Sequence, residues 1–437
     1  MSILSLACAA PARPQAAAPA AIADDPKAAS LIRDATRPFQ ERDWEAARKK
    51  LDEAKAINPR QAYLWSNYGA LALMLGKPNE AAEDFQRELA AHPDEDNVTL
   101  LLVGTQMQQH KSQEAIATLQ ALVVRSPNND QANGMLTSLL LNEKQYPAAE
   151  KVLRGFLAAH PDNVQAQLLL SNALVREDKK PEATALLKSI AEKTQDPALL
   201  NDAAYALADE NLDVPLAVTT ARRSLAMVER SPNAKPLIQA ELLVSVWDTL
   251  GWALFRAGNT AAAEPLVRAA WSNALTAEPG YHLGMILEKQ GQPAKAMAVY
   301  QIAAFGDKGG NADATAASIA ERQTALRKAG TPSQVPDGRN ALQALRTFTV
   351  PGKNTLTGSA TVELEFATTG ASNATIVKDD PKQAPLTSVE SSLYKIDFKA
   401  GVPAGSHATL TRRGILSCNA GNPCKFVLLS TRAALSN

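Results

Sequence analysis

Cysteine and histidine are the residues of this chain best suited to metal binding or nucleophilic chemistry, and few are present. Cys418 and Cys424 flank the turn-forming run Asn-Ala-Gly-Asn-Pro. A hairpin would bring these two positions within reach of a disulfide, which is the expected state of the pair. Two free buried thiols or half of a metal site are the alternatives. A disulfide would indicate an oxidising compartment and therefore export of the chain.

The histidines show no catalytic spacing. They are His92, His110, His160, His282 and His407. Two of them, His92 and His160, each precede a proline at equivalent repeat positions, where a helix dipole favours a basic residue. The sequence has no HExxH, CxxC, GxSxG or glycine-rich phosphate loop. We therefore expect no catalytic residue, no metal site and no cofactor, and predict that the chain is not an enzyme.

The charge and hydropathy of the chain argue against two kinds of partner, nucleic acid and a membrane spanned by the chain. Lysine plus arginine equals aspartate plus glutamate, at 45 each, so the formal net charge is zero. Nucleic-acid binding proteins usually carry a basic excess, so no nucleic-acid partner is expected. No apolar run reaches the 18 residues that suggest a membrane-spanning helix.

The N-terminal segment, residues 1–26, reads as a leader or a disordered Ala-Pro tail. Ala7-Cys8-Ala9 is similar to the small-x-small cleavage site of a secretory signal, although the basic start of such a signal is missing. A second interpretation makes Cys8 a lipidated cysteine, with Ser5 where that signal prefers leucine. The expected location is periplasmic or secreted, with a lipoprotein as the alternative.

A period of 34 residues organises most of the chain. Three residue classes share this period and its phase, which indicates a structural repeat. Alanine recurs at Ala47, Ala81, Ala115, Ala149, Ala183 and Ala217. Proline recurs at Pro59, Pro93, Pro127 and Pro161, and large apolar residues at Leu51, Phe85, Leu119, Leu153 and Leu187.

The repeat resembles the tetratricopeptide repeat, a helix–turn–helix unit. The second unit reads WSNYGALALMLGKPNEAAEDFQRELAAHP, with Gly69 on its first helix and Ala81 and Phe85 on its second. The seventh and eighth units keep the pattern with Gly251 and Gly284. About eight units are expected over residues 27–308. The resemblance implies a right-handed α-solenoid with a concave groove, so the predicted fold is mainly α.

Two features interrupt or end the array. The spacing from Ala217 to Ala263 is 46 residues, which indicates an insertion near MVERSPNAKPLIQAE, as an elongated helix or a protruding loop. Residues 309–345 are expected to form a capping helix, NADATAASIAERQTALRKAG, and a linker, TPSQVPDGRN.

Residues 346–437 are predicted to form a small α+β domain. ATVELEFATTG and NATIVKD indicate a first strand pair, PLTSVESSLYKIDF a helix, and HATLTRRGILSC and CKFVLLST a second pair. This order resembles the C-terminal domain of TonB-like proteins, with Tyr394 and Phe398 at the end of the helix. The tail is also similar to the end of bacterial proteins that carry a transglutaminase-like domain.

Two functions are consistent with these features. The first is a scaffold that binds a protein or peptide partner in the solenoid groove; the second is the regulatory C-terminal half of a larger transglutaminase-like protein. The family resemblance implies that first-helix side chains line the groove, and polar amides among them suit main-chain recognition. The residues expected there are Tyr63, Asn97, Met107, Gln131, Ser138, Gln165, Asn172, Asp202, Asp248, Trp252 and Phe255.

Overall fold

The computed structural model describes residues 24–230, 235–306, 312–352, 354–355, 357–367, 370–379, 389–396, 401–403, 406 and 408–429. Cys8 and the expected cleavage site, as well as His407 and Phe398, lie outside the described residues. The chain divides into two compact units, residues 1–159 and 160–437, which are described separately.

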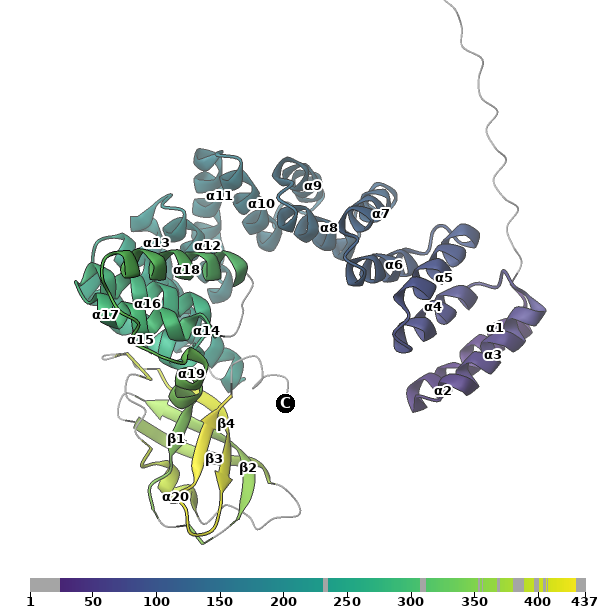
Figure 1. The fold of residues 1–437 in the computed structure, drawn as a ribbon. Helices are drawn as coiled ribbons and strands as arrows, with labels where there is room; N and C mark the ends of the chain where they lie inside the picture. Colours follow the sequence, from purple (N-terminus) through teal and green to yellow (C-terminus); the bar gives the residue numbers. More distant parts are fainter. Residues whose placement is uncertain are drawn as a thin grey trace, which may run out of the picture. The chain divides into compact units, whose positions relative to one another are not determined.

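The first unit consists of antiparallel helix pairs (Figure 1). Its helices are α1 (Pro26–Asp34), α2 (Thr36–Glu41), α3 (Trp44–Ile57), α4 (Leu64–Met74), α5 (Pro78–Ala91), α6 (Asp96–Gln108), α7 (Ser112–Arg125), α8 (Asp130–Asn142) and α9 (Tyr146–Ala159). From α4 onward each pair corresponds to one sequence unit. The apolar stripe of each helix is buried against its neighbours, since one pair cannot cover its own apolar face.

The second unit continues the helix pairs and adds a sheet. Its helices are α10 (Val164–Arg176), α11 (Lys180–Lys193), α12 (Pro197–Asp209), α13 (Val214–Arg230), α14 (Pro236–Arg256), α15 (Thr260–Ala274), α16 (Ala277–Lys289), α17 (Pro293–Ala303), α18 (Ala312–Lys328) and α19 (Gly338–Arg346). The insertion extends α13 to 17 residues and α14 to 21. The expected capping helix is α18, whereas α19 occupies part of the segment expected to be a linker.

The turn inside each helix pair needs a residue in the left-handed region. Seven such turns carry one, at Gly76, His110, Lys144, Asp178, Asn211, Gly258 and Gly291, with φ between 53° and 83°. Glycine adopts this conformation without strain, whereas the non-glycine residues adopt it with a small steric strain. This shared geometry explains how units with different turn residues keep one period.

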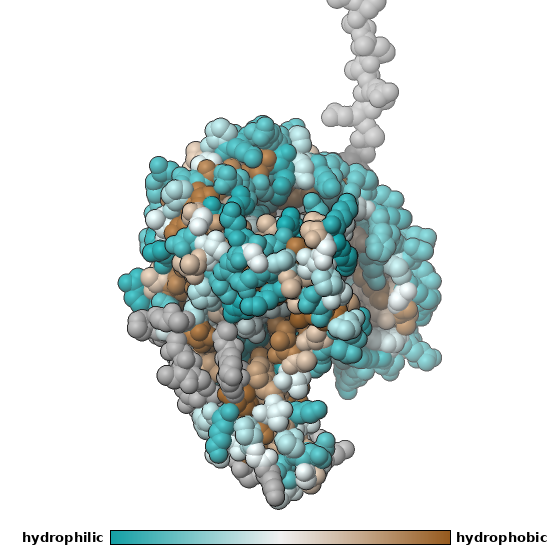
Figure 2. All heavy atoms as spheres, turned by 60° about the vertical axis from the view of Figure 1, so that its left-hand side comes forward, coloured by the Kyte–Doolittle hydropathy of each residue, from teal (hydrophilic) through white to brown (hydrophobic). Residues whose placement is uncertain are grey.

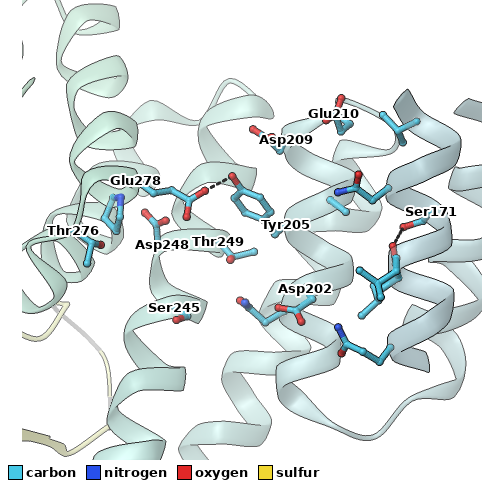
Figure 3. Close-up of a pocket in the computed structure, with 18 of the residues that line it drawn as sticks. Ser171, Asp202, Tyr205, Asp209, Glu210, Ser245, Asp248, Thr249, Thr276 and Glu278 are labelled. Carbon is cyan, nitrogen blue, oxygen red and sulfur yellow. Dashed lines mark hydrogen bonds between the residues drawn. The ribbon is translucent and has the colours of Figure 1, made fainter. Parts of the chain in front are cut away.

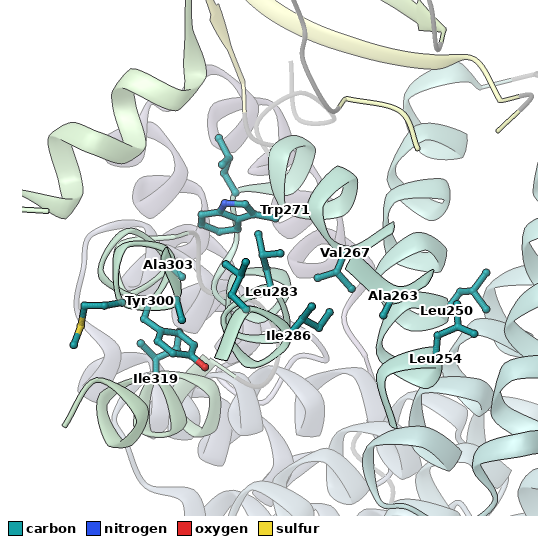
Figure 4. Close-up of a cluster of buried hydrophobic side chains, with 14 of the residues drawn as sticks. Leu250, Leu254, Ala263, Val267, Trp271, Leu283, Ile286, Tyr300, Ala303 and Ile319 are labelled. Carbon is teal, nitrogen blue, oxygen red and sulfur yellow. The ribbon is translucent and has the colours of Figure 1, made fainter. Parts of the chain in front are cut away.

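Close helix crossings explain the small residues of the repeat. A Cβ added at Gly69 would lie 2.6 Å from the ring of Phe85, and one added at Gly284 would lie 2.1 Å from the ring of Tyr300. The aromatic ring fills the space that the missing side chain leaves. Tyr300 belongs to a buried cluster that joins α14, α15, α16, α17 and α18 (Figure 4). In that cluster Ile319 of α18 is 1% exposed, so α18 covers the apolar end of the array.

The C-terminal sheet has five antiparallel strands in the order β1-β5-β4-β2-β3. They are β1 (Thr347–Thr349), β2 (Gly358–Ala367), β3 (Gly370–Asp379), β4 (Leu410–Cys418) and β5 (Lys425–Leu428). The alternation predicted for β2 is confirmed, because Val362, Leu364 and Phe366 are buried in the domain core. Strand β1 was not predicted from the sequence.

The helix of this domain ends earlier than predicted. Within the described residues it is α20 (Glu390–Leu393), and the amide of Ile396 donates to the carbonyl of Leu393 in a tighter turn that ends it. Val389, Leu393 and Ile396 are nevertheless buried against the sheet, as the apolar spacing indicates. The resemblance to TonB-like domains remains a prediction.

The sheet packs directly on the insertion helix. Ala408 and Leu410, which lead into and begin β4, share a buried cluster with Val244 and Trp247 of α14. Asn273 of α15 donates to the carbonyl of Gly401 over 2.6 Å. Figure 2 shows a mainly hydrophilic surface on one side of the molecule, with hydrophobic patches between the hydrophilic residues. The lengthened α14 therefore supplies the surface that carries the C-terminal domain.

Candidate functional site

A cavity of about 530 Å³ lies in the compact part of the chain that spans residues 160–437. The first helices of successive repeats form most of its wall. Side chains of α10, α12 and α14 and residues from Ala274 to Pro279 line it (Figure 3). We call it the first-helix pocket. Its acidic lining residues are Asp202, Asp209, Glu210, Glu241, Asp248 and Glu278, whereas Arg176 is its one basic lining residue within the described parts of the chain.

Helical spacing places these side chains on one surface. On α12, Asp202, Tyr205 and Asp209 follow the spacing i, i+3, i+7, which keeps them on one face of a helix. On α14, Glu241 and Asp248 are also seven residues apart. Because the same faces of neighbouring helices meet in a stacked array, the two acidic rows border one hollow.

A buried ion pair lies beside the pocket. The Nδ1 atom of His282 is 2.9 Å from the Oδ2 atom of Asp248, and both side chains are less than one tenth exposed. Burial opposes a charge on the imidazole, but Asp248, Glu278 and Asp209 outweigh it and raise the pKa of His282. The pair therefore favours an imidazolium–carboxylate arrangement.

Tyr205 and Glu278 form a second buried contact across the pocket. The hydroxyl of Tyr205 donates to Oε1 of Glu278 over 2.5 Å (Figure 3). Burial, followed by the negative charge of Glu278, raises the pKa of Tyr205, so the hydroxyl keeps its proton. Burial also raises the pKa of Glu278, although His282 and Tyr205 partly offset this effect.

Aromatic stacking fixes the imidazole of His282. The ring of Trp252 lies 4.1 Å from it at an interplanar angle of 15°, and Phe255 stacks on the same indole at 5.3 Å. The indole nitrogen of Trp252 donates to Oδ1 of Asp209 over 3.2 Å. These contacts prevent the ring from turning away from Asp248.

Two buried acceptors of the pocket lack a hydrogen-bond donor. They are Oδ1 of Asp248 and Oδ1 of Asn201, each on a residue less than one tenth exposed, and neither has a partner within the described residues. Buried polar atoms are nearly always hydrogen bonded in folded proteins. Because both residues line the cavity, a donor that entered it could reach them.

The structure brings together some of the predicted groove residues of this unit. Gln165, Asn172, Asp202 and Asp248 all line the first-helix pocket. Trp252 is 4% exposed and does not line it, so its ring belongs to the stacked core rather than to an open anchoring position. Phe255 is half-buried behind it.

The groove residues predicted within residues 1–159 are exposed, and they lie on or just before the first helix of their own repeat. They are Tyr63, Asn97, Met107, Gln131 and Ser138. Tyr63 precedes α4 with a φ of 67°, and its ring is 50% exposed. The hydroxyl of Ser138 donates to the carbonyl of Gly134 over 2.9 Å. None of these residues lines the first-helix pocket.

Several pocket residues were not predicted from the sequence, notably Tyr205, Asp209, Glu241 and Glu278. The heptad spacing of Asp202 and Asp209, with Tyr205 between them, was a usable signal for one acidic face. Tyr205 also stands where the repeat usually has glycine or alanine, and the residue before it, Ala204, is fully buried. Glu278 lies in the first turn of α16, and no spacing in the sequence indicates that it reaches the pocket.

Two kinds of site are not found in the parts of the chain that the structure describes. No group of three or more histidine, cysteine, aspartate or glutamate side chains there could hold a metal ion. No described helix combines the length and hydropathy needed to cross a membrane.

Comparison with family models gives four matches, all described as tetratricopeptide repeat. One model matches residues 72–139 and 140–208, and a second matches residues 35–96 and 249–313. Together they cover more than half of the chain. No curated protein matches the sequence.

Several solved structures of low sequence identity are similar to parts of this chain. A tetratricopeptide repeat protein from Parabacteroides merdae is 15% identical, with a TM-score of 0.40, over 69% of this chain and 99% of that one. The C-terminal part of a TPR repeat-containing protein from Cytophaga hutchinsonii is 15% identical, with a TM-score of 0.42, over 61% and 98% of the two chains. Yeast Tom70 is 14% identical, with a TM-score of 0.40, over 72% and 68%.

Proposed function

Because the chain belongs to the tetratricopeptide-repeat family, whose members generally act as protein-interaction scaffolds, we propose that it binds an extended segment of a partner protein in the first-helix pocket. The single observation that carries this proposal is the pocket itself, where polar side chains from successive units line one continuous hollow. Repeat arrays commonly bind partners along such surfaces.

The polar lining suits recognition of a main chain. Gln165 and Asn172 are exposed on α10 at the edge of the pocket, and each amide offers both a donor and an acceptor. The hollow is shared by several rigid helices, so the partner segment would bind with little reorganisation of the solenoid.

Capture of the partner by the purified full chain tests the proposal. The double variant Gln165→Ala with Asn172→Ala should lose most of the partner that the wild-type chain retains. The matched control changes Lys188 of α11 and Arg222 of α13, which are exposed outside the pocket, to alanine. Equal capture by the groove variant and the control would exclude the pocket as the binding surface.

We also propose that the chain works in an oxidising compartment of the cell envelope or outside the cell. The support is the cysteine pair, because the Cα atoms of Cys418 and Cys424 are 4.3 Å apart and both side chains are buried at the end of β4 and before β5. The small-x-small segment around Cys8 supports the same location, with lipidation of Cys8 as the alternative to cleavage. Fractionation of cells with the chain expressed from its own start tests the location, and recovery in the cytosol alone would contradict it.

A further inference from the structure

We infer that the first-helix pocket receives a lysine or arginine side chain from the bound segment. This inference rests on the proposed function and adds the chemistry of the group that is recognised. It has two independent supports, the uncompensated charge of the lining and the unpartnered acceptors that face the hollow.

Charge pairing within the pocket leaves an acidic excess. Arg176 is bound to Glu210 over 2.8 Å, so the one basic side chain of the lining is already neutralised. His282 is engaged with Asp248. Neither Asp202 nor Glu241 has an ion-pair partner within the residues that the structure describes. The buried guanidinium of Arg412 attracts Glu241 without forming a salt bridge, whereas Asp202 faces no cation in the described residues. A cation entering the pocket would therefore still meet an excess of carboxylates, and the low-dielectric walls would strengthen the attraction.

The unpartnered acceptors identify the kind of cation. Oδ1 of Asp248 and Oδ1 of Asn201 both need a donor, and neither finds one in the described parts of the chain. An ammonium group carries three N–H donors and a guanidinium five, without any acceptor. A side chain of this kind would donate hydrogen bonds to both oxygens, and these charge-assisted bonds are stronger than those from water. An acidic ligand would offer acceptors instead of donors.

The apolar part of the lining suits a long side chain. Leu169 and Val175 of α10 are half-buried at the pocket and offer a surface for a methylene stem. Lysine and arginine bury such stems while their charged ends remain among polar groups. A bare divalent ion has no comparable support, because no group of three potential ligands is present in the described residues.

Selection from a random nonapeptide library displayed on phage tests the inference with the full-length chain. We expect the wild-type chain to enrich peptides with lysine or arginine at one fixed position. A synthetic peptide of the enriched sequence is then compared with its norleucine analogue, which keeps the stem and removes the charge. The wild-type chain should bind the cationic peptide about tenfold more tightly, as expected for one charge-assisted hydrogen-bonded contact.

Two variants assign this preference to the pocket. Asp202→Asn combined with Glu241→Gln should remove most of the tenfold difference, whereas Glu192→Gln, an exposed acid of α11 outside the pocket, should keep it. Both changed pocket residues are at least partly exposed, and circular dichroism would confirm that the double variant is folded.

The outcomes separate the inference from the function on which it rests. Peptides that are enriched without a basic residue, and that lose binding in the Gln165→Ala, Asn172→Ala variant, would overturn the inference and leave the groove function standing. A basic preference that persists in the Asp202→Asn, Glu241→Gln variant would also overturn the inference. Failure to enrich any peptide that depends on the groove would overturn both.

Discussion

The imidazole of His282, on α16, is held 2.9 Å from the carboxylate of Asp248, on α14, and the indole of Trp252 stacks on the face of the imidazole. This relationship links adjacent repeat units through a buried charged pair rather than through apolar contact alone. Asp248 lines the pocket, and its second carboxylate oxygen, Oδ1, has no hydrogen-bond donor among the described residues. The same residue thus connects the packing of the solenoid with the chemistry of its candidate binding surface.

Stability should depend on pH through His282. The carboxylates of Asp248, Glu278 and Asp209 raise its pKa above the ordinary 6.5, and the hydroxyl of Tyr205 faces the same cluster. The folded chain therefore binds more protons than the unfolded chain between the two pKa values, so its free energy of unfolding falls as pH rises through that interval. The contribution is fully present below about pH 6.5 and is lost above the raised value.

Denaturant unfolding at several pH values between about 6 and 9 measures this dependence. The free energy of unfolding of the wild-type chain should fall more steeply with rising pH than that of His282→Gln, which cannot titrate. Parallel curves for the two proteins would show that His282 does not gain a proton on folding.

Glycine substitutions should separate close crossings from open helix positions. Gly69→Ala in α4 would push a methyl group against Phe85, so we expect a loss of about 1–3 kcal/mol from overpacking. Gly134→Ala in α8 meets nothing within 4 Å and should gain up to about 1 kcal/mol from helix propensity. Thermal melting followed by circular dichroism should shift in opposite directions for the two variants.

Replacing a repeat alanine with a larger residue should lower stability, as replacing Gly69 does. Ala149 of α9 is fully buried, and Ala149→Leu would have to displace its neighbours at a cost of about 1–3 kcal/mol. An unchanged melting midpoint for Ala149→Leu would contradict the assignment of this residue to a helix crossing.

Cys418 and Cys424 are predicted to form a disulfide in protein isolated from its native compartment. The short loop between them constrains the unfolded chain only modestly, by roughly 2–3 kcal/mol on the loop-entropy model. Non-reduced peptide mapping should detect the two cysteines in one linked species. Two free thiols would contradict both the disulfide and the proposed oxidising location.

The repeat and its helix pairs were predictable from the sequence because local rules determine them. Gly69, Ala81 and Phe85 report the small and large partners of one crossing, and 34-residue spacing repeats that relationship. The alternation of Val362, Leu364 and Phe366 likewise predicted β2. These signals lie within one element or one unit, where residue spacing corresponds to a face.

The pocket was only partly predictable, since its members meet through stacking of different units. Asp202 and Asp248 are 46 residues apart, and the insertion between them changes the lengths of α13 and α14. Trp252 was expected in the groove because of its repeat position, but an adjacent imidazole and Phe255 enclose its ring. Strand β1 is three residues long and gains its identity only by pairing with β5.

Site-specific photo-crosslinking tests the central claim most directly. A photoreactive phenylalanine analogue at Ser245, which is exposed on α14 and lines the pocket, would be compared with the same analogue at Lys188 outside it. We expect one partner protein to be cross-linked from Ser245 through a single extended segment, with little product from Lys188. Cross-linking of that partner from Lys188 but not from Ser245 would contradict binding in the first-helix pocket.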